Sequence, residues 1–187
     1  MFDISADQIS RIENVLSGVH RGASVAIRNA NKRALTAAKT AGINQTKARY
    51  TLKQGEITKA VRIKSTGNIG RIEAKGHRIK LTNFNLQPTA PITTPRGGKV
   101  TVEVVKGKPV AMPHAYYQFL GVYPAGVFFH EKGSSKSTEF MGPAVAEILG
   151  RKATIKLMEE TAQKVFYDRS EHEIMRLLSG IGGSRNK

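Results

Sequence analysis

The chain has 187 residues, of which 30 are Lys or Arg and 14 are Asp or Glu, so its net charge is +16. It contains no cysteine, which excludes a disulfide framework, a thiolate zinc site and a cysteine nucleophile. No run of about 18 apolar residues is present, so we expect a soluble protein that does not span a membrane. The basic excess indicates a polyanion nearby: a nucleic acid, an anionic membrane surface or an acidic protein.

Two helices are predicted in the first 41 residues. Ser5 and Gln8 have the spacing of a capping box, which predicts a helix over about 5–17. A second helix is predicted from Val19 to Ala41, ending at Gly42. Its predicted packed side consists of small residues: Val19, Ala23, Ala26, Ala30, Ala34, Ala37 and Ala41.

The opposite side of the second predicted helix carries four cations, Arg21, Arg28, Lys32 and Lys39. Their spacing is close to whole helical turns, so they form one straight stripe. No acidic residue occurs between Glu13 and Glu56, so the stripe has no partner on its own helix. It is either a solvated face or a contact for phosphates or an acidic protein, and any DNA contact is expected to be sequence-independent.

In the middle of the chain, apolar and polar residues alternate as they do in β-strands. A short helix leading into a strand is predicted over 51–64, and an exposed loop or arm at Gln87–Pro95. This arm reaches a neighbouring subunit or belongs to a self-contained monomer. The aromatic segment 115–130 is expected to supply the largest share of buried area. The predicted strands are 70–74, 78–82, 99–105, 109–112 and 126–131.

A short helical turn at 143–149 and a last helix over about 153–179 complete the predicted elements. Residues 143–179 carry equal numbers of acids and bases, so the charge excess lies elsewhere in the chain. We predict one α+β domain over 1–187, with N-terminal helices (1–60), a central antiparallel β-sheet (61–132) and a long C-terminal helix (143–179) packed on the sheet. The predicted packed positions of that helix are Ile155, Met158, Ala162, Val165, Phe166, Met175, Leu177 and Leu178.

No pattern of catalytic or metal-ligating residues is found. His130-Glu131 lacks the second histidine that a metalloprotease helix requires. The turn at 95–99 lacks the spacing of a phosphate-binding P-loop and is read as a hairpin turn. We therefore expect no enzyme activity, no catalytic residues, no metal and no cofactor. The five histidines are scattered: His20, His77, His114, His130 and His172.

Several segments resemble the minor tail protein Z family of long-tailed bacteriophages, also called tail completion proteins. The resemblance is carried at the C-terminal side by Met141-Gly-Pro-Ala-Val-Ala-Glu-Ile-Leu-Gly150 and by the helix ending in Glu171-His-Glu-Ile-Met-Arg-Leu-Leu178. It is carried further by Ala125-Gly-Val-Phe-Phe-His-Glu-Lys132 and by the alanine-rich Ala26-Ile-Arg-Asn-Ala-Asn-Lys-Arg-Ala-Leu35.

The resemblance implies a virion structural protein, a head-tail connector component that assembles in the host cytoplasm and ends up in the tail. Such a protein forms a ring, expected to be a hexamer, near the head-proximal end of the tail tube. Its implied partners are tail tube, terminator or connector proteins and the passing genomic DNA, with no membrane partner. Arg21, Arg28, Lys32 and Lys39 then face the DNA channel or an acidic partner. The alternative is a basic, sequence-independent nucleic-acid-binding architectural protein.

Overall fold

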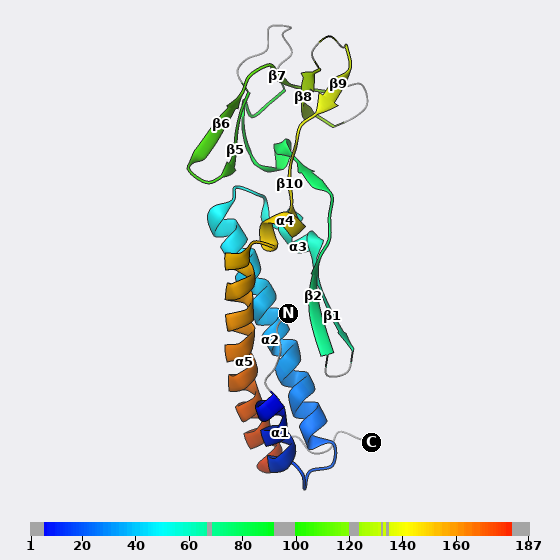
Figure 1. Cartoon of the computed structure of the whole chain (residues 1–187), viewed down its shortest axis with the longest axis vertical. Helices are drawn as coiled ribbons and strands as arrows, with labels where there is room; N and C mark the ends of the chain where they lie inside the picture. The colour runs from blue at the N-terminus through cyan, green and yellow to red at the C-terminus, as the bar shows by residue number, and fades with distance from the viewer. Residues whose placement is uncertain are drawn as a thin grey trace. The chain divides into compact units, whose positions relative to one another are not determined.

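A computed structural model of the chain describes residues 6–66, 69–91, 100–119, 124–131, 133 and 135–180. The α+β prediction is confirmed: helices lie at both ends of the sequence and antiparallel sheets between them (Figure 1). The chain forms two compact units, and each is described by itself. We call Met1–Gly42, Val61–Glu73 and Lys152–Lys187 the helical unit, and Ile43–Ala60 and Ala74–Arg151 the sheet unit.

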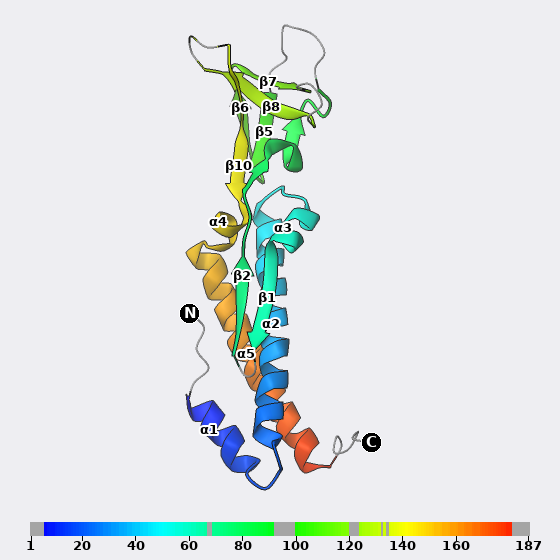
Figure 2. The ribbon, with the colours of Figure 1, turned by 90° about the vertical axis from the view of Figure 1, so that its right-hand side faces the viewer.

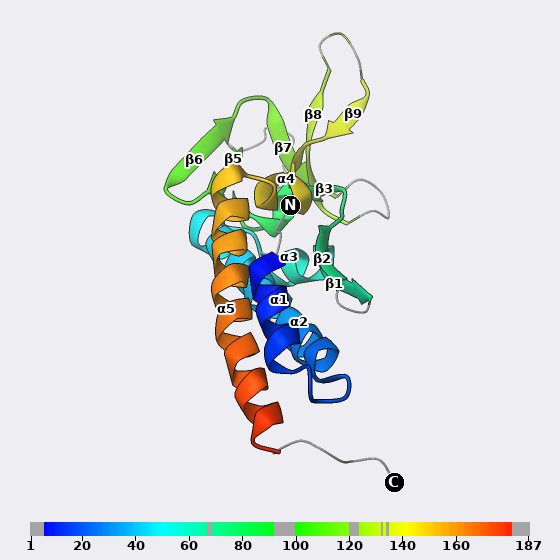
Figure 3. The ribbon, with the colours of Figure 1, turned by 60° about the horizontal axis from the view of Figure 1, so that its bottom comes forward.

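As far as its residues are described, the helical unit is built from three helices and a paired strand hairpin. The hairpin consists of β1 (Val61–Thr66) and β2 (Ile69–Ala74). The helices are α1 (Ala6–Val15), α2 (Gly22–Arg49, as far as Gly42) and α5 (Lys152–Leu178). In Figure 2 the hairpin runs along α2, and Figure 3 shows α1 beside α2 and α5.

The core of the helical unit is made where α1, α2 and α5 meet. On α2 the fully buried alanines are Ala26, Ala30, Ala34 and Ala38, a row with four-residue spacing. On α5 the buried row Ala162, Phe166, Ser170 and Ile174 has the same spacing. Rows of this spacing are the ridges along which helices interdigitate, and alanines let the two backbones approach closely.

The predicted packed side of α2 is correct for Ala26, Ala30 and Ala34 but wrong at its end. Ala37 and Ala41 are only half-buried, whereas Ala38 is 2 % exposed. A packed row at every fourth residue drifts around the helix, because four residues turn through more than one full turn. Near the end of the row, the buried alanine is therefore Ala38 and not the predicted Ala37.

The prediction that Gly42 ends the second helix is also wrong, because α2 continues through it to Arg49. A Cβ built on Gly42 lies 2.6 Å from the sulfur of Met158 on α5. No side chain fits there without displacing Met158. Gly42 is thus a point of close approach between two helices rather than a helix terminator.

Three of the residues predicted to pack on the last helix are exposed: Ile155 at 40 %, Met175 at 70 % and Leu178 at 57 %. Two polar residues take core positions, Thr154 and Ser170. The Ser170 hydroxyl donates to the Tyr167 carbonyl at 2.8 Å, which satisfies it within its own helix. The buried side chains of α5 share a cluster with α1 and α2, and Ile72 of the hairpin packs against that cluster.

The described strands of the sheet unit form three small antiparallel sheets. Together with the hairpin, the strands of the described residues form four separate sheets instead of one continuous sheet. The strand orders are β4-β5-β6, β7-β8-β9 and β10-β3. The strands are β3 (Arg78–Lys80), β4 (Asn85–Gln87), β5 (Val100–Val105), β6 (Lys108–Met112), β7 (Ala115–Gln118), β8 (Gly126–His130), β9 (Ser137–Glu139) and β10 (Met141–Ala144).

Short helices complete the sheet unit: α3 (Gln54–Ala60), α4 (Val145–Leu149) and the single turn η1 (Leu81–Asn83). The aromatic segment contributes unevenly to its core, because Tyr117 and Phe128 are buried whereas Phe119 is 64 % exposed. The expected Gln87–Pro95 arm begins inside β4, where Gln87 pairs with Thr101. Residues 92–95 of that arm, and Tyr123, lie outside the described residues.

Candidate cationic face

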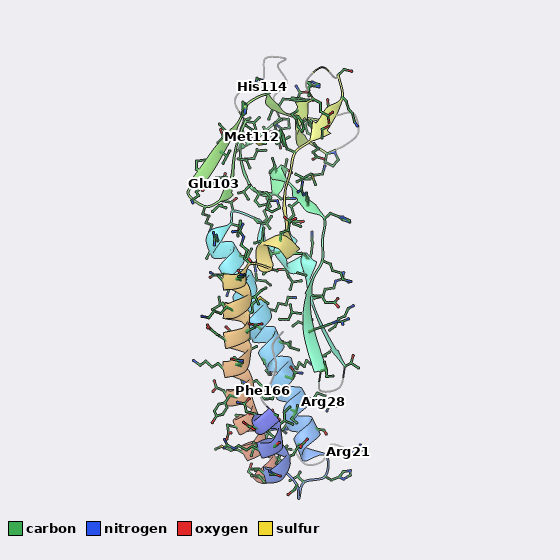
Figure 4. The ribbon with its side chains drawn as sticks, in the orientation of Figure 1. Arg21, Arg28, Glu103, Met112, His114 and Phe166 are labelled. Atoms are coloured by element: carbon green, nitrogen blue, oxygen red, sulfur yellow. The ribbon has the colours of Figure 1, made fainter. Side chains whose placement is uncertain are left out.

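The structure places the four predicted cations in different environments. Arg21 precedes α2 with a φ of 56°, and its carbonyl accepts a hydrogen bond from the Val25 amide at 3.1 Å. Arg21 is therefore the residue from which the helix starts, and its predicted place on the helical stripe is wrong. Arg28 and Lys32 lie exposed on α2, whereas Lys39 is half-buried. Figure 4 shows Arg21 in the segment before α2 and Arg28 on the helix itself.

The hairpin interrupts the stripe between Lys32 and Lys39. Leu35 follows Lys32 by three residues and precedes Lys39 by four, so all three lie on the same side of α2. Leu35 is only 4 % exposed, and its Cδ1 atom approaches Gly70 of β2 so closely that a Cβ there has no room. The continuous stripe expected from the sequence is therefore reduced to Arg28 and Lys32, with Lys39 beyond the covered segment.

Arg28 and Lys32 mark a cationic face on α2. A groove between α2 and α5 extends this face toward α5. It encloses about 510 Å³ and takes its cations from both helices. Its lining residues are Asn29, Lys32, Arg33, Thr36, Arg169, His172 and Glu173. The sequence separates the two walls by more than a hundred residues, and only the packing of α5 along α2 brings them together.

Among the described residues, Glu173 is the one carboxylate that lines the groove, and it already accepts hydrogen bonds. It accepts hydrogen bonds from Asn29 Nδ2 at 3.1 Å and from Arg176 at 2.7 Å and 3.1 Å. Partial burial raises the pKa of Glu173, but the hydrogen bonds from Asn29 and Arg176 and the Arg176 charge outweigh it, so the pKa lies below its ordinary value. Glu173 is ionised at neutral pH, and Arg176 compensates its charge.

The remaining cations of this face have no such partner. Of the ion pairs formed within the described residues, none includes Arg28, Lys32, Arg33, Lys39 or Arg169. Other cations of the helical unit are paired, for example Arg11 with Glu171 at 3.1 Å. The face thus concentrates uncompensated positive charge on one side of α2 and the adjoining side of α5. Such a surface attracts a polyanion.

Two members of this face are missing from the sequence prediction. Arg33 follows Lys32 directly and lies about 100° around the helix, outside the straight stripe. Arg169 belongs to a helix whose acids and bases balance, so its local sequence carries no signal. Arg33 could have been found by asking which side of α2 remains uncovered, but Arg169 could be found only from the helix packing.

His130 stacks on Tyr116 with ring centroids 5.1 Å apart. Among the residues that the structure describes, no group of three or more His, Asp or Glu side chains is arranged to hold a metal ion. In the same part of the chain, no helix combines the length and apolar character needed to cross a membrane.

Comparison of the chain with protein-family models, with curated proteins and with solved structures finds no match. The cationic face and the sequence resemblance are therefore the two observations on which a function can be argued.

Proposed function

We propose that this chain is a structural tail completion protein of a long-tailed phage, forming a ring near the head-proximal end of the tail tube. The sequence resemblance to the minor tail protein Z family is the first support for this function. The observation that carries it further is the uncompensated charge of Arg28, Lys32, Arg33 and Arg169 on one face of the helical unit. A ring repeats the same face in every subunit, so it multiplies a modest charge into a basic surface around a common axis. A passing genome supplies the phosphates that such a surface requires.

Exposed strand edges and apolar side chains support the self-association that a ring needs. Among the described strands, β6 lies at the edge of its sheet, and nearly all of its residues are exposed, with Val110 at 59 %. An unpaired edge presents backbone groups that a neighbouring chain can pair with. On α5, Met175 and Leu178 expose apolar surface that a neighbouring subunit can cover.

The second candidate function is a basic, sequence-independent nucleic-acid-binding protein of the architectural kind. The same face and the net charge of +16 favour it. The two proposals differ in what the isolated chain does. An architectural protein stays monomeric and coats DNA, whereas a tail protein binds DNA weakly and associates with itself or with tail components.

The test is the mass of the purified full chain by light scattering over a series of salt concentrations, alone and mixed with a short DNA duplex. A discrete oligomer that persists as salt rises, with little DNA bound at physiological salt, supports the tail protein. A lasting monomer that covers the duplex and is released steeply by salt refutes the ring and favours the architectural protein.

A further inference from the structure

We propose that the groove between α2 and α5 is a binding site for the phosphate backbone of duplex DNA, contacted by Lys32, Arg33 and Arg169. The choice of DNA as the source of the phosphates rests on the proposed function. The chemistry of the groove, an anion site made by two helices, follows from its lining residues.

Three cations from two helices border the same hollow. Lys32 and Arg33 extend from α2 and Arg169 from α5, and all three are exposed. Two of them are guanidinium groups, whose planar fork of donors matches the oxygens of a phosphate. None of the three forms an ion pair within the described residues, so none must leave an internal partner to bind an anion.

The carboxylate in the groove does not oppose this reading. Glu173 Oε2 accepts hydrogen bonds both from Arg176 and from Asn29 of α2. Its charge is compensated by Arg176, so the three remaining cations give the groove a net charge of about +3. The Asn29–Glu173 hydrogen bond also joins the two helices at the groove and so fixes the spacing of its walls.

The position on α2 suits a backbone contact. Arg28 lies one turn before Lys32, so the cations continue along the helix beyond the groove. Contacts of this kind position a protein on a duplex without reading its bases. The described lining residues include no Phe, Tyr or Trp, and His172 carries the one ring among them, which favours backbone contact over single-strand binding.

The experiment compares two triple variants of the full chain that remove the same charge. The groove variant is Lys32→Ala, Arg33→Ala and Arg169→Ala. The control variant is Lys152→Ala, Lys156→Ala and Lys164→Ala, three exposed cations of α5 outside the groove. Every change in both variants replaces an exposed helical side chain with alanine, which favours helix, and circular dichroism checks that both remain folded.

Affinity for a fluorescent duplex is measured by anisotropy at salt concentrations from about 50 to 200 mM. Each phosphate contact contributes about 0.9 to the slope of log affinity against log salt, so loss of three contacts lowers the slope by about 2.7. We expect this decrease for the groove variant and a decrease below about 0.9 for the control variant. Equal decreases in the two variants, or no duplex binding by the parent chain at the lowest salt, overturn the groove assignment.

A parallel titration with polyglutamate tests the competing partner class. Tighter binding of polyglutamate than of duplex, lost in the groove variant alone, assigns the groove to an acidic protein and overturns the DNA site. The outcome for the tail function is separate. If the chain forms a ring and the groove variant binds DNA as the parent does, the groove assignment fails and the tail function is retained. If the chain stays monomeric and the groove variant loses DNA binding, the groove assignment is retained and the ring is refuted.

Discussion

Replacement of Gly42 by alanine tests how the helical unit is packed. Gly42 lies inside α2, and a Cβ at this position meets Met158 at 2.6 Å from the sulfur, 3.1 Å from Cγ and 3.3 Å from Cε. The first distance is shorter than a real contact, so the substitution must displace the Met158 side chain or push α2 away from α5. Gly42→Ala therefore introduces overpacking at a helix crossing.

Two opposing effects set the magnitude. Alanine is favoured over glycine in a helix interior by about 1 kcal/mol. Overpacking a core contact costs about 1 to 3 kcal/mol. We expect a net loss of about 1 kcal/mol for Gly42→Ala in the parent chain. When Met158 is first shortened to alanine, the obstruction is gone, and the same substitution should gain about 1 kcal/mol.

The assay is a double-mutant cycle of Gly42→Ala and Met158→Ala in the full chain, with urea unfolding followed by the helical circular dichroism signal. The expected coupling between the two positions is about 2 kcal/mol. A coupling below about 0.5 kcal/mol, with the same effect of Gly42→Ala in both backgrounds, contradicts the close approach of α2 and α5 at Gly42.

Two further predictions concern the same unit. Phe166, which is 1 % exposed, should cost about 3 to 5 kcal/mol when replaced by alanine, whereas Tyr167→Ala, its 44 % exposed neighbour, should change the free energy of unfolding by less than about 0.5 kcal/mol. Similar losses in urea unfolding would contradict the core assignment. Glu173→Gln should cost about 1 kcal/mol at neutral pH, because its carboxylate accepts charged hydrogen bonds from Arg176. Since the folded pKa of Glu173 lies below its unfolded value, this contribution is complete above the unfolded value and is lost as pH falls through the folded one. The parent and the variant should therefore converge in stability at acid pH, and a difference that persists there would refute the role of the ionised carboxylate.

The order of the elements could be predicted from sequence periodicity because each is encoded locally. The alanines of α2, the alternating segments of β2 and β5, and the long C-terminal helix all lie close to their expected positions. Local signals fail where one residue has two physical uses. Glycine is typical of a helix end, but Gly42 lies inside α2 where the helix packs closely against α5. Which of the two roles it has depends on Met158, more than a hundred residues away in the sequence.

The candidate site could be predicted only in part for a related reason. A helical wheel identifies which residues of α2 share a side, and Arg28 and Lys32 do lie exposed on one side of it. It does not show which part of that side another element covers, and the contact of Gly70 with Leu35 depends on the path of the hairpin. The groove adds a second helix, and no pattern within α5 separates Arg169 from the other charged residues of that helix.

Both the buried and the exposed side of α2 bear on the proposed role of the cationic face. In the core cluster shared with α1 and α5, the buried α2 residues are four alanines and Ile27, and each alanine contributes little apolar area to the stability of the free chain. The exposed side of α2 places Arg28 and Lys32 one turn apart, a like-charge pair that costs about 0.2 to 0.5 kcal/mol. Within the described residues no carboxylate offsets this repulsion through an ion pair with either residue. A polyanion bound along α2 removes the repulsion and gains phosphate contacts at the same time. On the proposed function, DNA bound along α2 offsets this repulsion, so the free chain is the less favourable state of this surface.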